Sequence, residues 1–123
     1  MLHTTNNSDK RKKKIREKIK LQDKHRLTVY KSNKHIYAQL YKYDGSKVLD
    51  SMSSVNKLFK QNIELNNLTN LTKIEQSKIV GNLLAIKMKQ KNINSIVFDR
   101  SGFKFHGRIK AVADAIKENG INI

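Results

Sequence analysis

Hydrophobic and polar residues alternate along residues 26–41, in two runs separated by a polar tetrapeptide. The odd positions 27 and 29 are apolar in the first run, and the even positions 36, 38 and 40 are apolar in the second. A two-residue loop at Asn33-Lys34 pairs residue 29 with 38 and residue 27 with 40, which brings both apolar sets to one face. The pattern therefore predicts an antiparallel hairpin, with Asn33 in the positive-φ conformation that such turns use.

A third strand and a polar connection follow the hairpin. Asp44-Gly45 is typical of a tight turn, and residues 47–52 predict a weaker third strand. Residues 53–72 are polar and rich in asparagine. They predict a surface connection with one short helix around residues 55–61.

The next segment has helical periodicity. Thr72-x-x-Glu75 is a capping-box pattern, which marks a helix start. The apolar stripe, which continues until the helix ends near residue 92, consists of Ile79, Val80, Leu83, Leu84 and Met88. Gly81 interrupts this helix at a cost of about 1 kcal/mol relative to alanine. We expect Gly81 to allow a close approach to the sheet.

Residues 93–98 read as a buried strand, and residues 107–119 as a closing helix that ends at Gly120. Residues 121–123 could add a short strand. A strand, a helix and a strand in this order imply a parallel crossover connection. The expected fold class is α/β: a three-stranded antiparallel meander, a crossover helix, a parallel strand, and helices packed on the sheet.

Charge narrows the possible functions. The chain has 123 residues, 26 Lys plus Arg, 10 Asp plus Glu and a net charge of +16. So much positive charge repels itself in a compact chain, and a polyanionic partner such as nucleic acid explains it best. The absence of cysteine excludes disulfides and thiolate metal sites. The four histidines lack metal-ligand spacing, and no apolar run could span a bilayer. We expect no metal, cofactor, small-molecule substrate or membrane partner.

Residues 1–25 are predicted to form a basic arm, and residues 26–123 a single domain. The arm has too few apolar residues to fold alone and no apolar core of a signal peptide. We expect it to bind phosphates, with a short helix from about residue 8; a solvated basic tail is the alternative. Its candidate RNA-binding residues are Lys10, Arg11, Lys12, Lys13, Lys14, Arg16, Lys18 and Lys20.

The segment DRSGFKFHGR, residues 99–108, lies between the parallel strand and the last helix, where α/β sheets place ligands. A helix N-terminus and basic side chains favour an anion there, glycines permit close approach, and aromatic rings can stack on bases. The alternative is that one phenylalanine fills the core and Gly107 merely begins the helix. We expect both to hold in part, with Phe103 or Phe105 buried and Asp99 paired with an arginine. The candidates are Arg100, Ser101, Gly102, Phe103, Lys104, Phe105, His106, Gly107, Arg108 and Lys110.

The non-core face of the hairpin is a second candidate surface, because flat sheet faces with aromatic and basic residues commonly bind RNA. Its candidates are Arg26, Tyr30, Lys31, Ser32, Asn33, Lys34, His35, Tyr37 and Gln39. Tyrosines that are merely exposed to solvent, or that pack beneath a helix, are equally compatible with the pattern.

Two long blocks resemble the bacterial-type large-subunit ribosomal protein eighteen, a family that binds 5S ribosomal RNA. They are RLTVYKSNKHIYAQL (residues 26–40) and IVFDRSGFKFHGRIKAVADAIKENGI (residues 96–121). The basic arm, the Asp44-Gly45 turn, the capped helix with Gly81 and the Gly-Ile ending are also similar. The sequence departs from the family at Ser101, usually glycine; His25, usually proline; and Phe103 and Phe105, usually tyrosine. Residues 53–72 match poorly.

The resemblance implies a fold with a ribonuclease H-like motif and a structural role rather than an enzyme. It implies that the protein binds 5S rRNA and attaches it to 23S rRNA in the central protuberance, beside another 5S-binding ribosomal protein. The ribosome would be that of a bacterial cytoplasm or of an organelle such as a plastid. It also implies that the arm, residues 30–39 and residues 100–110 face RNA.

Two alternatives were weighed against that reading. One is a general binder of structured RNA or double-stranded nucleic acid without a ribosomal role. The other is a nuclease, which needs several converging carboxylates for two-metal cleavage. Here only Asp99, with His106, is near the basic loop, so we expect a binder.

Overall fold

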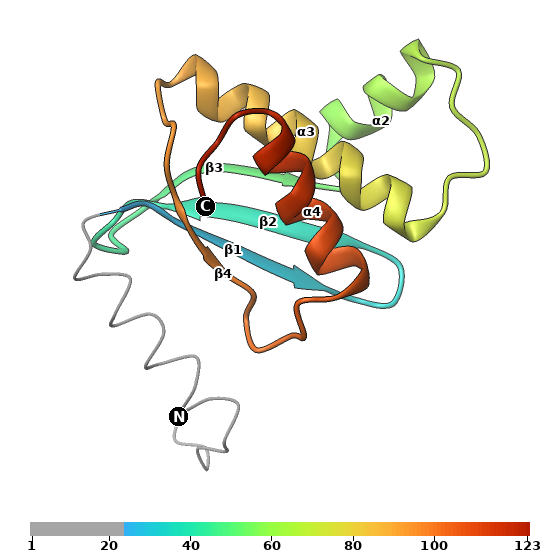
Figure 1. The fold of residues 1–123 in the computed structure, drawn as a ribbon. Coiled ribbons are helices and arrows are strands. Elements are labelled where there is room, and N and C mark those ends of the chain that lie inside the picture. The colour runs from blue at the N-terminus through green and yellow to red at the C-terminus, as the bar shows by residue number, and fades with distance from the viewer. Residues whose placement is uncertain (1–23) are drawn as a thin grey trace.

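A mixed four-stranded sheet forms one layer of the protein, and helices form the other (Figure 1). The computed structural model describes residues 24–123, so the helix predicted in the arm lies outside the described residues. The strand order is β3-β2-β1-β4, with β1 antiparallel to β2 and parallel to β4. The strands are β1 (Arg26–Lys31), β2 (Ile36–Tyr41), β3 (Val48–Ser53) and β4 (Val97–Asp99). The predicted α/β class, meander and parallel strand are confirmed.

The hairpin has the predicted register, with Leu27 opposite Leu40. Its turn differs from the prediction, because neither Asn33 nor Lys34 has a positive φ. Instead, the Ser32 N–H donates to the His35 carbonyl (2.9 Å), and the His35 N–H donates to Ser32 Oγ (3.3 Å). The serine hydroxyl supplies a turn hydrogen bond, so this turn needs no left-handed residue.

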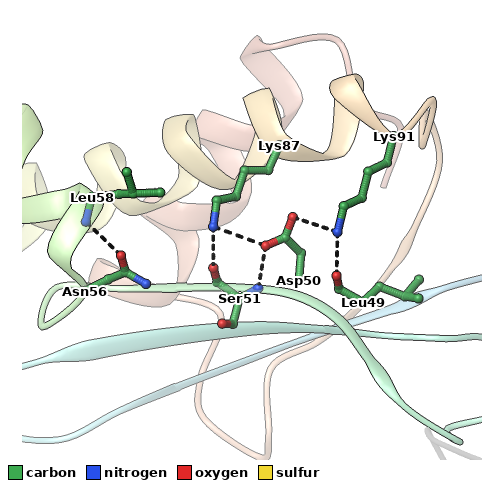
Figure 2. Close-up of polar contacts among 7 residues, drawn as sticks. All are labelled: Leu49, Asp50, Ser51, Asn56, Leu58, Lys87 and Lys91. Carbon is green, nitrogen blue, oxygen red and sulfur yellow. Dashed lines mark hydrogen bonds and ion pairs between the residues drawn. The ribbon is translucent and has the colours of Figure 1, made fainter.

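The second turn and the helix after β3 are close to the prediction. Gly45 has φ +77° and its N–H donates to the Lys42 carbonyl (2.8 Å), as a tight turn requires. Helix α2 (Lys57–Leu65) begins two residues later than predicted and extends further. Its start is fixed by Asn56, whose side chain accepts from the Leu58 N–H (2.9 Å; Figure 2).

Helix α3 (Lys73–Gln90) begins with the predicted capping box. Thr72 Oγ1 accepts from the Glu75 N–H, and Glu75 Oε1 accepts from the Thr72 N–H, both at 3.1 Å. These hydrogen bonds from the Thr72 backbone and side chain lower the pKa of Glu75. Val80, Leu84 and Met88 are completely buried on the sheet side of the helix.

Gly81 faces another helix rather than the sheet, so the prediction for its neighbour is wrong. Helix α4 (Gly107–Glu118) lies beside α3 on the same face of the sheet (Figure 1). A Cβ atom at Gly81 would lie 2.7 Å from the Val112 carbonyl oxygen and 2.8 Å from Ala115 Cβ. The missing side chain therefore lets the two helices touch through their backbones.

Strand β4 is shorter than predicted, because residues before it bond to the C-terminal segment. The Ile96 N–H donates to the Asn122 carbonyl (2.9 Å), and the Asn122 N–H donates to the Asn94 carbonyl (2.8 Å). The predicted C-terminal strand is accordingly an isolated parallel bridge between Ser95 and Asn122.

Two lysines of α3 clamp the edge strand β3 (Figure 2). Asp50 accepts Lys87 Nζ and Lys91 Nζ, each at 3.2 Å. The same ammonium groups donate to strand carbonyls, Lys87 to Ser51 (3.3 Å) and Lys91 to Leu49 (2.6 Å). These two positive charges therefore serve the fold, unlike the exposed basic residues elsewhere.

The contact at Gly81 gives a test of the fold. Replacing Gly81 with alanine should lower the free energy of unfolding by about 1–3 kcal/mol, although alanine favours a helix by about 1 kcal/mol. The exposed Lys78→Ala variant is the control and should change stability little. Urea unfolding measures both; a more stable Gly81→Ala variant would contradict the close helix contact.

Candidate nucleic-acid interface

The sheet has an open face, formed by alternate residues that point away from α3 and α4. The core residues Leu27, Val29, Ala38 and Leu40 occupy the helix-covered face, so their neighbours along the strands occupy the other. Within residues 24–123, both α3 and α4 lie on the core side (Figure 1). The alternative that the hairpin tyrosines pack beneath one of these helices is therefore wrong for the described part of the chain.

Aromatic rings and polar side chains are ordered along this open face. The Tyr30 and Tyr37 rings stack with centroids 4.9 Å apart and an interplanar angle of 14°. The Tyr41 hydroxyl donates to Gln39 Oε1 (2.8 Å), and the Arg26 guanidinium lies 4.8 Å from the Tyr41 ring centroid. All five side chains are half-buried, which gives a preorganised surface rather than scattered exposed tyrosines.

The hairpin tip and the loop before α4 lie together, although they are far apart in sequence. Arg108 Nη1 donates to the Ser32 carbonyl at 2.8 Å. Lys31 Nζ lies 5.7 Å from the centroid of the Phe103 ring. Two of the surfaces predicted separately from the sequence, residues 30–39 and 100–110, are therefore one continuous region.

The loop itself is shaped by Asp99, which is 1% exposed. One carboxylate oxygen accepts the Ser101 N–H at 2.9 Å. Ser101 (φ +56°) and Gly102 (φ +79°) are both left-handed, so the serine occupies a conformation that favours glycine. The predicted ion pair between Asp99 and an arginine stays a prediction.

The loop aromatic residues divide their roles as expected. Phe103 is half-buried against the core, whereas Phe105 is 39% exposed. The Phe105 ring meets Phe98 edge to face at 6.0 Å and lies 5.9 Å from Lys117 Nζ. Phe103 thus anchors the loop, and Phe105 presents an aromatic ring to the surface.

Helix α4 begins without a side-chain cap, because the His106 side chain makes no capping hydrogen bond. The first turn of α4 also contains no acidic residue. Its N–H groups and the nearby Lys104 and Lys110, both exposed, favour an anion at this end of the helix.

The predicted RNA-binding residues fall into three groups by exposure. The exposed ones are Ser32, Asn33, Lys34, Arg100, Gly102, Lys104, Phe105, His106 and Lys110; the half-buried ones are Arg26, Tyr30, Lys31, His35, Tyr37, Gln39, Ser101, Phe103, Gly107 and Arg108. The arm residues Lys10 to Lys20 lie outside the described residues.

Sequence reasoning missed Ser54, which supports the hairpin tip. Its Oγ lies 2.8 Å from His35 Nδ1 and accepts the Ile36 N–H at 3.2 Å. Ser54 is 5% exposed and sits in a polar segment with no pattern that would single it out. It fixes His35 from below and so belongs to the support of this region.

Among residues 24–123, no group of three or more His, Cys, Asp or Glu side chains could hold a metal ion. The helices in this part of the chain include none that is long and apolar enough to cross a membrane.

Comparison with known proteins identifies the family. Residues 2–123 match the family described as ribosomal L18 of archaea, bacteria, mitochondria and chloroplasts. The chain belongs to this family. The predicted recognition is confirmed, and membership places the protein in the large ribosomal subunit as a member of a structural, non-enzyme class.

Relatives named large ribosomal subunit protein uL18 cover almost the whole chain. That of Hydrogenovibrio crunogenus is 42% identical over 112 residues, which cover 91% of this chain and 92% of the relative. That of Pseudomonas aeruginosa is 42% identical over 112 residues, 91% of this chain and 90% of the relative. That of Geobacter metallireducens is 44% identical over 114 residues, 92% of this chain and 89% of the relative.

The backbone at Ser101 gives a prediction about stability in this L18 protein. Replacing Ser101 with glycine should raise the free energy of unfolding by about 0.5–1 kcal/mol, because glycine adopts positive φ without the penalty of a side chain. Ser46→Gly is the matched control: Ser46 has no positive φ, so its replacement should not stabilise the protein. Thermal unfolding of both variants decides, and a destabilised Ser101→Gly protein would contradict the inferred strain.

The contact between Arg108 and the hairpin tip gives a second prediction. Arg108→Ala should weaken RNA binding without changing its salt dependence, because this guanidinium holds the Ser32 carbonyl. Lys104→Ala should instead reduce the slope of log K against log salt, by up to about one unit. Arg108→Lys keeps a donor and should restore much of the affinity. Titrations at several salt concentrations measure this; a reduced slope for Arg108→Ala would show that Arg108 binds phosphate directly.

Proposed function

We propose that this protein binds 5S rRNA and attaches it to 23S rRNA in the central protuberance of the large subunit. The observation that carries the proposal is the junction of hairpin tip, loop and open face into one basic, aromatic region. Arg108 and Lys31 bridge the tip and the loop, and the stacked tyrosines continue the region across the sheet.

The charge distribution supports a phosphate-rich ligand. Lys34, Arg100, Lys104 and Lys110 are exposed in this region, while the acidic residue of the loop, Asp99, is buried. Exposed lysine and arginine side chains neutralise phosphates, and most contacts to a folded RNA go to phosphate and sugar. Recognition of RNA shape therefore fits this surface better than reading of a base sequence.

The division into an arm, residues 1–25, and a domain, residues 26–123, forms part of the proposal. The first described strand starts at Arg26, at the boundary inferred from composition. We propose that the arm adds phosphate contacts beyond those of the domain, because its lysines and arginines outnumber its acids.

A second 5S-binding ribosomal protein is the proposed neighbour, and catalysis is not part of the proposed function. Asp99, the carboxylate nearest to the loop, accepts a hydrogen bond from the Ser101 backbone, which is a loop-shaping role. General binding of structured RNA is the competing function, and the test below separates the two.

A competition gel shift tests the proposal with the full-length chain. Labelled 5S rRNA should be retained when excess tRNA or duplex DNA is added, and unlabelled 5S rRNA should displace it. Replacing Lys12, Lys13 and Lys14 together with alanine should reduce the salt slope by up to about one unit for each lost contact.

The same assay has two informative failures. Equal displacement by tRNA would favour a general RNA binder. Cleavage of the labelled RNA in the presence of Mg²⁺, abolished by Asp99→Asn, would reveal a nuclease instead.

A further inference from the structure

The row of side chains at the tip end of the open face contains an unfilled stacking position. Tyr30, Tyr37 and Ser53 are partners across β1, β2 and β3, so all three project from the same face. Tyr30 and Tyr37 stack on each other, which turns the second face of the Tyr37 ring toward β3. At that position the sheet carries serine, whose side chain is too small to cover an aromatic ring.

From this geometry we propose that Tyr37 stacks an unpaired nucleobase of the bound RNA above Ser53. The inference rests on the proposed function, because it names the part of the RNA that this face binds. Neighbouring strands are about 4.8 Å apart, so one planar ring fits above Ser53 beside Tyr37. The base extends the two-ring stack to three rings.

The position is open on its outer side. β3 is the edge strand of the sheet, and no further strand lies beyond it in the described chain (Figure 1). Lys87 and Lys91 contact β3 from the other face of the sheet, so their side chains leave this position clear. A base can therefore enter from the β3 edge without displacing a described side chain.

The surroundings of Tyr37 match a nucleotide rather than an apolar ligand. The His35 ring lies 6.5 Å from the Tyr37 ring at 64° and is held by Ser54 Oγ (2.8 Å). Exposed Lys34 at the hairpin tip supplies a cation for the phosphate of the same nucleotide. Serine hydroxyl, imidazole and ammonium groups thus surround the ring.

A base must be unpaired to use this position. In an A-form duplex each base face is covered by its neighbours, so only a bulged, looped or terminal base exposes a face for stacking. The structure therefore assigns the tip end of the open face to a non-helical part of the RNA. The exposed lysines of the loop are left for helical phosphates.

Four variants of the full chain test this assignment by titration with a bacterial 5S rRNA. Tyr37→Leu removes the ring, and Ser53→Val fills the position without changing the ring. Each should weaken binding roughly tenfold or more, the effect of losing one stacked base. Tyr37→Phe keeps the ring, and Ser51→Val alters the same strand one position along the face; both should bind within about twofold of the original protein. Thermal unfolding checks that each variant is folded.

Salt dependence and cross-linking make the outcome specific. The salt slope of Tyr37→Leu should equal that of the original protein, because stacking neutralises no phosphate. Ultraviolet cross-linking should join an unpaired nucleotide to the tryptic peptide of residues 35–42, and Tyr37→Leu should lose that cross-link.

Failure of this inference is distinguishable from failure of the proposed function. If Tyr37→Leu and Ser53→Val bind 5S rRNA as tightly as the original protein, and 5S rRNA is still preferred over tRNA, stacking at Tyr37 is wrong and the proposed function stands. If the original protein shows no preference for 5S rRNA, the proposed function fails. The cross-link to residues 35–42 then still tests stacking with any RNA that binds.

Discussion

One-sided burial of the sheet is the constraint on which the rest of this structure depends. Leu27, Val29, Ala38 and Leu40 are buried beneath α3 and α4, and the helices approach each other through Gly81. A small chain with a charge of +16 has little apolar surface to bury, so its core fills a single face. The opposite face is consequently available for aromatic and polar residues, and a partner that neutralises the charge also stabilises the fold.

The candidate interface is built by long-range contacts rather than by one motif. Arg108 connects the N-terminus of α4 to the hairpin tip, and Lys31 contacts Phe103 of the loop. The Lys87, Lys91 and Asp50 clamp fixes the other edge of the sheet and removes two positive charges from solvent. Basic residues thus have two roles in this L18 protein, and their hydrogen bonds distinguish those that hold the fold from those that remain exposed.

Local signals in the sequence predicted most elements of the fold. Alternation fixed the hairpin register, the Thr72 capping box marked α3, and Gly120 marked the end of α4, because each depends on neighbouring residues. Features set by tertiary contact were beyond the sequence: the helix that faces Gly81 and the short β4, whose preceding residues bond to the C-terminus. The same holds for the site. Composition indicated its residues, but their junction and the support from Ser54 arise only in the folded chain.

The central claim is that RNA contacts the tip, the loop and the open face, and leaves the α2–α3 side free. Mapping of amide chemical shifts in the isotope-labelled protein, with and without 5S rRNA, tests this most directly. We expect the largest changes in residues 26–41 and 99–110, with residues 57–65 unaffected. Changes concentrated in α2 and the outer side of α3, with the hairpin and loop unchanged, would contradict the account.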